Sequence, residues 1–223
     1  MSRYTKEQAI KIITKAAENY RDELVDKTLL FVCADKHHDI VCYEFSFYNW
    51  NFMHLTGVKT REQDNRDKHL SAIDFYNKCI SHKLSPSNFE FSEDGTTHMK
   101  LEILSTVLCK NLSAKMIGTY NHSKPYLFTN KIAGSTKACL GFVVDSTHNC
   151  FVPNTLLKDD IRHNVYGYAR VIATFRKDVY TQKYDELTYI AKNIDWSNIK
   201  LPKEFKYLLE YKFSNSSNKQ KSE

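Results

Sequence analysis

Glycine is scarce in this 223-residue chain, with only six residues of this type. Neither a GxGxxG turn nor a Walker loop can form from the local sequence, so we expect no nucleotide cofactor. The chain also lacks HExxH, GxSxG and any close acidic cluster of the two-metal nuclease kind. If the chain is an enzyme, these absences favour acid–base chemistry that uses no metal and no cofactor.

Two further absences bear on the cellular compartment in which the protein is expected. The six cysteines are scattered without a CxxC pair, which argues against a zinc knuckle or a disulfide framework. No stretch reaches the roughly 18–20 apolar residues of a membrane span, and the polar N-terminus lacks the apolar run of a signal peptide. We therefore expect a cytoplasmic protein that contacts no membrane.

The composition is that of a folded chain, with 42% hydrophobic and 13% aromatic residues. This apolar content is enough to offset the conformational entropy lost on folding. A net charge of +6, from 32 basic and 26 acidic residues, favours a polyanionic partner such as nucleic acid. Residues 214–223 are polar and charged, and we expect them to be a disordered tail.

The order of the predicted elements indicates an α+β fold. A capping-box pattern and apolar residues at helical spacing predict a helix over residues 6–26. Two β-branched and aromatic runs follow within residues 29–47, and helical spacing returns over 67–84 and 101–112. Residues 126–177 read as a meander of about four short strands. Helices followed by an antiparallel sheet are typical of the α+β class.

We expect one folded unit with short extensions. Its predicted parts are an N-terminal helix (1–27), a main domain (28–200), a C-terminal segment that packs on it (201–213) and the tail (214–223). No internal repeat or long linker interrupts the main domain.

The segment NFMHLTGVK, residues 51–59, contains the histidine of most interest. If it is a strand, His54 and Thr56 lie on the same face because alternate residues share a face. The pKa of a histidine is close to neutrality, so His54 can act as a general acid or base, and the hydroxyl of Thr56 can orient it. A half-buried, hydrogen-bonded structural histidine is the alternative.

Two polar segments have the chemistry of a phosphate site. Residues 120–124 place Lys124 beside imidazole and hydroxyl groups, although an ordinary turn explains them as well. Residues 129–137 alternate hydroxyl and ammonium side chains, among them Lys131 and Thr136. Solvated surface strands show the same alternation.

A third segment, residues 152–164, is too long for a hairpin and too apolar for a linker. It contains Asn154, Thr155 and Arg162, and an arginine is the natural bidentate ligand of a phosphate. In the competing interpretation, its leucine and isoleucine residues dock the loop on the core while a neighbouring aspartate pairs with Arg162.

Four runs in this order carry a resemblance to a known family: FMHLTGV, ACLGF, CFVPNTLLKDDIR and YIAKNIDW. Together they resemble a phage-associated family of nucleases named after barnase, EndoU, colicin and RelE, over roughly residues 29–196. The resemblance implies an α+β domain with helices packed on a roughly four-stranded antiparallel sheet. It also implies cleavage of RNA without a metal, by attack of the ribose 2′-hydroxyl on its own phosphate.

The resemblance extends to individual residues only where the chain shows the motif. In this hypothesis, His54 is the acid or base, Arg162 holds the phosphate, and Thr56, Asn154 and Thr155 are orienting donors. Lys124, Lys131 and Thr136 are added on their chemistry alone. The expected partners are RNA and a cognate inhibitor or host protein, as for a toxin. The alternative is a phage effector that keeps the fold and binds RNA or protein without catalysis.

Overall fold

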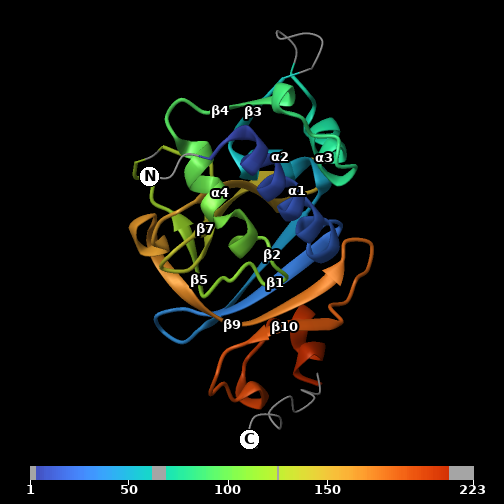
Figure 1. The fold of residues 1–223 in the computed structure, drawn as a ribbon. Helices are drawn as coiled ribbons and strands as arrows, with labels where there is room; N and C mark the ends of the chain where they lie inside the picture. The colour runs from blue at the N-terminus through green and yellow to red at the C-terminus, as the bar shows by residue number, and fades with distance from the viewer. Residues whose placement is uncertain (1–3, 62–68, 125, 211–223) are drawn as a thin grey trace, which may run out of the picture.

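The computed structural model describes residues 4–61, 69–124 and 126–210 (Figure 1), and the predicted tail over residues 214–223 lies outside these ranges. The helices are α1 (Lys6–Glu23), α2 (Phe52–Thr56), α3 (Ala72–Ile80) and α4 (Thr96–Val107), with 3-10 turns η1 (Asn49–Asn51), η2 (Pro86–Asn88), η3 (Ile161–His163), η4 (Trp196–Asn198) and η5 (Lys203–Glu210). The strands are β1 (Lys27–Ala34), β2 (Ile40–Phe47), β3 (Val58–Thr60), β4 (Phe89–Phe91), β5 (Met116–Tyr120), β6 (Lys131–Gly134), β7 (Cys139–Asp145), β8 (Cys150–Leu157), β9 (Val165–Asp178) and β10 (Glu186–Ile190).

Within this part of the chain, seven strands form a closed mixed barrel in the order β1-β2-β8-β7-β6-β5-β9, and β9 pairs back on β1. Neighbouring strands are antiparallel except β2 and β8, which run parallel where Phe45 lies opposite Phe151. Strand β10 adds to β9 outside the ring, and β3 pairs with β4 in a separate small sheet. In Figure 1 the four α-helices lie together at one end and β10 lies at the other.

The prediction of helices on a roughly four-stranded antiparallel sheet is wrong, and the length of β9 is the reason. At its start, β9 pairs with β5, with Arg170 opposite Met116. Its second half pairs with β1, as far as Asp178 opposite Lys27. The hairpin of β1 and β2 is thereby drawn into the sheet, and its free edge meets β8. The predicted meander therefore becomes part of a larger ring.

The predicted N-terminal helix is confirmed, together with both hydrogen bonds of its capping box at Thr5 and Gln8. One face of α1 is buried, including Ile13 and Tyr20, against the main apolar core. The Tyr20 hydroxyl donates to the Tyr48 carbonyl at 3.0 Å, so the buried ring leaves no unpaired polar atom. This packing fixes the helices against one side of the sheet.

A second apolar cluster holds the segment after β10 against β1 and β9. The rings of Phe175 and Trp196 lie 5.5 Å apart, and the indole nitrogen of Trp196 donates to the Leu208 carbonyl at 2.9 Å. All six cysteines are free. None of the helices in the described ranges is both long and apolar enough to cross a membrane.

Candidate functional site

His54 lies on a short helix, so the strand predicted over residues 51–59 is wrong at this position. The helix α2 ends where Gly57 adopts a left-handed conformation with φ 70°, and β3 begins directly after it. Residues two apart on a helix point in different directions. The His54 side chain is exposed, whereas Thr56 is fully buried and its hydroxyl donates to the Met53 carbonyl at 2.7 Å. The two side chains therefore do not form one acid–base unit.

A buried lysine supports this helix. Nζ of Lys100 donates to the His54 carbonyl at 3.0 Å, and Lys100 is only 8% exposed. Burial lowers the pKa of Lys100 to about 8. His54 is exposed but its ring is partly desolvated by its neighbours, and this desolvation, followed by the charge of Lys100, lowers the pKa of His54. Among the described residues, no carboxylate pairs with the His54 imidazole.

Lys131 and Thr136 lie on β6 and in the turn that follows it. Nζ of Lys131 donates to Oγ1 of Thr119 at 2.8 Å and lies 5.1 Å from the centre of the Tyr43 ring. Burial lowers the pKa of Lys131. Thr136 is exposed in the turn between β6 and β7. Lys131 is thus a partly buried cation, and Thr136 is free to face solvent.

Asn154 and Thr155 occupy an irregular part of β8, where the register against β7 shifts. The side-chain amide of Asn154 donates to the Phe128 carbonyl at 2.7 Å. Thr155 is 8% exposed, and a Cβ added at Gly141 would lie 2.8 Å from both its methyl group and Oγ1 of Thr129. Asn154 therefore holds the connection between β5 and β6 against the sheet, and Thr155 packs beside Gly141.

That connection is bound to η3, and the bonds bring two sequence segments together. The Asn121 side chain donates to the His163 carbonyl at 2.9 Å, and the Ser123 hydroxyl donates to the same oxygen at 3.3 Å. The Asn121 N–H donates to the Asn164 carbonyl at 3.0 Å. His122 stands between Asn121 and Ser123, so its backbone runs beside that of His163. We call this group the histidine-pair site, made of His122, Ser123, Lys124, Arg162 and His163.

His163, unlike His54, has an orienting carboxylate within the described part of the chain. Its Nδ1 lies 3.0 Å from Oδ1 of Asp159. Burial would raise the pKa of Asp159, but hydrogen bonds from Asn164 and His163 outweigh it and lower the pKa. An ionised carboxylate at Nδ1 fixes the proton on that nitrogen and leaves Nε2 as the reactive atom. The imidazole is largely exposed, so a substrate can reach it.

The backbone of His122 is held in a left-handed conformation with φ 58°. This conformation costs roughly 1–3 kcal/mol for a residue other than glycine, and such strain is often found at functional sites. The His122 ring lies 4.9 Å from the ring of buried Tyr120. The Tyr120 hydroxyl donates to the Ser123 carbonyl at 2.6 Å and accepts the Leu127 N–H at 3.0 Å. The connection is thus built around a buried tyrosine that fixes the place of His122.

Arg162 on η3 and the exposed Lys124 in the connection between β5 and β6 are the two cations of this group. Its Nε and Nη2 donate to Asp160 at 2.5–3.0 Å. These hydrogen bonds lower the pKa of Asp160 to about 2. The competing interpretation of this loop is confirmed, because Ile161 is fully buried and Arg162 pairs with a neighbouring aspartate. An exposed pair of this kind contributes little stability, and Nη1 bonds to no described residue, so it can reach a phosphate.

The predicted site residues therefore fall into separate places. Lys124 and Arg162 lie on two segments that the bonds from Asn121 and Ser123 to the His163 carbonyl hold together. His54 belongs to another part of the molecule: α2 packs against α1, α3, α4 and β8, whereas η3 packs against β6 and β9. Across the described residues, no hydrogen bond or ion pair joins His54 to Arg162.

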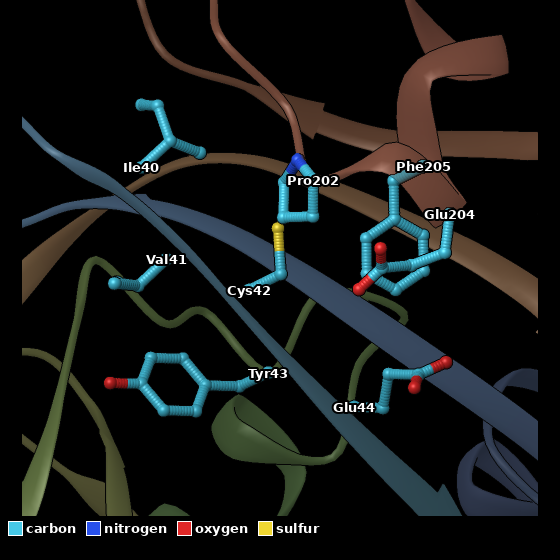
Figure 2. A pocket seen from close by; sticks show the side chains of 8 residues that line it. All are labelled: Ile40, Val41, Cys42, Tyr43, Glu44, Pro202, Glu204 and Phe205. Carbon is cyan, nitrogen blue, oxygen red and sulfur yellow. The ribbon is translucent and has the colours of Figure 1, made fainter.

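A cavity of about 450 Å³ lies elsewhere, between β2 and the C-terminal segment. Figure 2 shows Cys42 pointing toward Pro202, with the carboxylates of Glu44 and Glu204 at its side. Burial and these two carboxylates raise the pKa of Cys42 to about 12. Two acidic groups repel phosphate, so this cavity does not suit RNA. Over the described ranges, no group of three or more His, Cys, Asp or Glu side chains is placed to hold a metal ion.

Two joined segments thus carry a carboxylate-oriented histidine, a second histidine and two cations, which are side chains that acid–base catalysis on a phosphate ester can use. The chain matches the model of the phage-Barnase-EndoU-ColicinE5/D-RelE like nuclease4 family over residues 12–193, and it belongs to that nuclease family. The resemblance carried by the four sequence runs is thereby confirmed. Among curated proteins and solved structures, none matches the chain.

Proposed function

We propose that this nuclease is an endoribonuclease of phage or mobile-element origin that cleaves RNA by acid–base catalysis without a metal. The observation that carries the proposal is the 3.0 Å contact between Nδ1 of His163 and Asp159, at a place where η3 meets the connection that contains His122. Together these groups supply a base, an acid and cations, which are what the reaction needs.

In the proposed reaction, Nε2 of His163 takes the proton of the ribose 2′-hydroxyl, and that oxygen attacks the adjacent phosphorus. The bond from phosphorus to the 5′-oxygen of the next nucleotide breaks, and protonated His122 donates a proton to this leaving oxygen. The products are a 2′,3′-cyclic phosphate and a 5′-hydroxyl end. Arg162 and Lys124 stabilise the negative charge that builds on the phosphate oxygens.

His54 is the rival base, because the family motif contains it. The two assignments make different predictions for the same assay, which is cleavage of end-labelled RNA in EDTA by purified protein. His163→Ala and His122→Ala should each lower the rate about 10²- to 10⁴-fold, the usual contribution of a general acid or base. His54→Ala should change it little, and His37→Ala, in an exposed turn, is the matched control.

A DNA strand of the same sequence should remain intact, because it lacks the 2′-hydroxyl. Loss of activity in His54→Ala with full activity in His163→Ala would move the catalytic base to α2. Absence of cleavage by the unaltered protein across varied RNAs, with RNA binding retained, would replace the ribonuclease with the non-catalytic binding protein.

A further inference from the structure

Four exposed aromatic side chains lie on the two chain segments that continue from the histidine-pair site. Tyr126 is 78% exposed, Phe128 87%, Tyr166 75% and Tyr168 49%. Soluble proteins seldom leave several large rings exposed on neighbouring segments unless the rings bind something. We call these four residues the aromatic face.

The two halves of the aromatic face are joined by a small apolar cluster. Leu127 and Val165 belong to this cluster, which also contains Tyr120. Val165 lies opposite Tyr120 in the pairing of β5 with β9, and the Leu127 N–H donates to the Tyr120 hydroxyl. Because Leu127 and Val165 both pack at Tyr120, the two segments that carry the exposed rings are held next to each other.

The aromatic face continues into the histidine-pair site. Tyr166 follows Asn164 by two residues, and the Asn164 carbonyl accepts the N–H of Asn121. Asp160 chiefly raises the pKa of Arg162, and Tyr168 adds to the rise, which agrees with Tyr168 and Arg162 being neighbours. The segments that carry the exposed rings therefore adjoin those that carry the exposed cations.

We propose that the aromatic face stacks on the unpaired bases of a single-stranded RNA whose scissile phosphate lies at the histidine-pair site. This inference rests on the proposed ribonuclease function. Bases of any kind offer a π-face to Tyr and Phe, while Lys124 and Arg162 complement the phosphates between them. A duplex hides its base faces in its own stack, so the surface selects unpaired strands.

The charge of the neighbouring groups favours nucleic acid over a protein as the occupant. An apolar protein partner would need the adjacent cations to be neutralised or desolvated, which is costly. A polynucleotide supplies one negative charge for each nucleotide, and its bases alternate with those charges along the strand.

The test is binding of a short, labelled 2′-O-methyl RNA strand, which cannot be cleaved because its 2′-oxygen carries no proton. Fluorescence anisotropy gives Kd for the strand alone and for the strand annealed to its complement. Phe128→Ala and Tyr166→Ala should each weaken single-strand binding roughly 5- to 150-fold, as expected for loss of one stacked base. Tyr180→Ala, which removes a tyrosine 85% exposed at the end of β9, is the matched control and should leave Kd unchanged.

The duplex should bind more weakly than the single strand. Equal Kd values for Phe128→Ala, Tyr166→Ala and the unaltered protein would overturn the inference, as would tighter binding of the duplex. If these two variants instead abolish self-association seen by light scattering, while Kd for RNA stays the same, the face binds protein and the inference fails.

Cleavage is measured separately on unmodified RNA, so the two proposals fail independently. If RNA binding depends on the rings but no RNA is cleaved, the proposed role of the aromatic face is supported and the proposed ribonuclease activity is refuted. If RNA is cleaved but its binding does not depend on the rings, the ribonuclease activity is supported and the role of the aromatic face is refuted.

Discussion

The buried ammonium of Lys100 should make the stability of this protein rise with pH in the alkaline range. Lys100 is 8% exposed, and burial moves its pKa from 10.5 to about 8. Lowering a pKa by one corresponds to about 1.4 kcal/mol, so the charged form destabilises the fold by about 3 kcal/mol at neutral pH. The hydrogen bond to the His54 carbonyl offsets part of the cost of holding the amine in place.

The pH window follows from where the proton is lost. Below a pH of about 8, Lys100 is charged in both the folded and the unfolded state, so the full cost is present. Between about 8 and 10.5, the folded protein has lost the proton and the unfolded chain still holds it. The unfolded state then binds more protons, and the free energy of unfolding increases with pH.

The perturbation is Lys100→Met, which keeps an unbranched side chain of similar length and removes the charge. The free energy of unfolding is measured by guanidinium chloride denaturation of both proteins from neutral pH to about pH 10. The difference, unaltered protein minus variant, should increase by roughly 2 kcal/mol over this range, which is most of the 3 kcal/mol available. Other lysines and tyrosines titrate in both proteins and cancel. If the free energies of unfolding of the two proteins change in parallel with pH, the ammonium is solvated in the folded protein and the reasoning is refuted.

Two further predictions concern the sheet and the site. Gly118→Ala should lower the free energy of unfolding by about 2–4 kcal/mol, because its Cβ would collide with the Gly167 carbonyl oxygen. Gly167→Ala, whose Cβ would meet no atom within 4 Å, should change it by no more than about 0.5 kcal/mol, and equal effects of the two variants in thermal melts would contradict the packing. Asp159→Asn should lower kcat of RNA cleavage about 10- to 100-fold, with KM and Tm little changed, because Asp159 orients His163. If kcat and its pH profile are unchanged in this variant, Asp159 has no part in the mechanism.

Local patterns predicted the elements well and their assembly poorly. The capping box of α1 and the β-branched and aromatic residues of β1 and β2 act within a few residues, so they can be read directly from the sequence. Closure of the barrel depends on two distant strands that share one long neighbour. The sequence of β9 indicates a strand, but nothing in its 14 residues indicates that β5 and β1 pair with different halves of it.

The strand prediction around His54 was wrong for a different reason. Its sequence, FMHLT before Gly57, is short enough to fit a strand or one turn of helix, because five residues show neither period clearly. A glycine directly after an apolar run is a common helix end, and its left-handed conformation here has φ 70°. That signal favoured the helix and would have separated His54 from Thr56.

The histidine-pair site shows what sequence reasoning could reach and where it stops. Asp159 and His163 are four residues apart, a local spacing that hints at their ion pair. Nothing local joins His163 to His122, because their connection depends on the pairing of Tyr120 with Val165 and on the register shift between Gly118 and Tyr120. The same pairing joins the segments that carry the exposed rings to those that carry the two histidines. If the proposed roles are right, a change of register in β5 and β9 would disturb base stacking and proton transfer together, because both groups of residues depend on the end of this one strand pair.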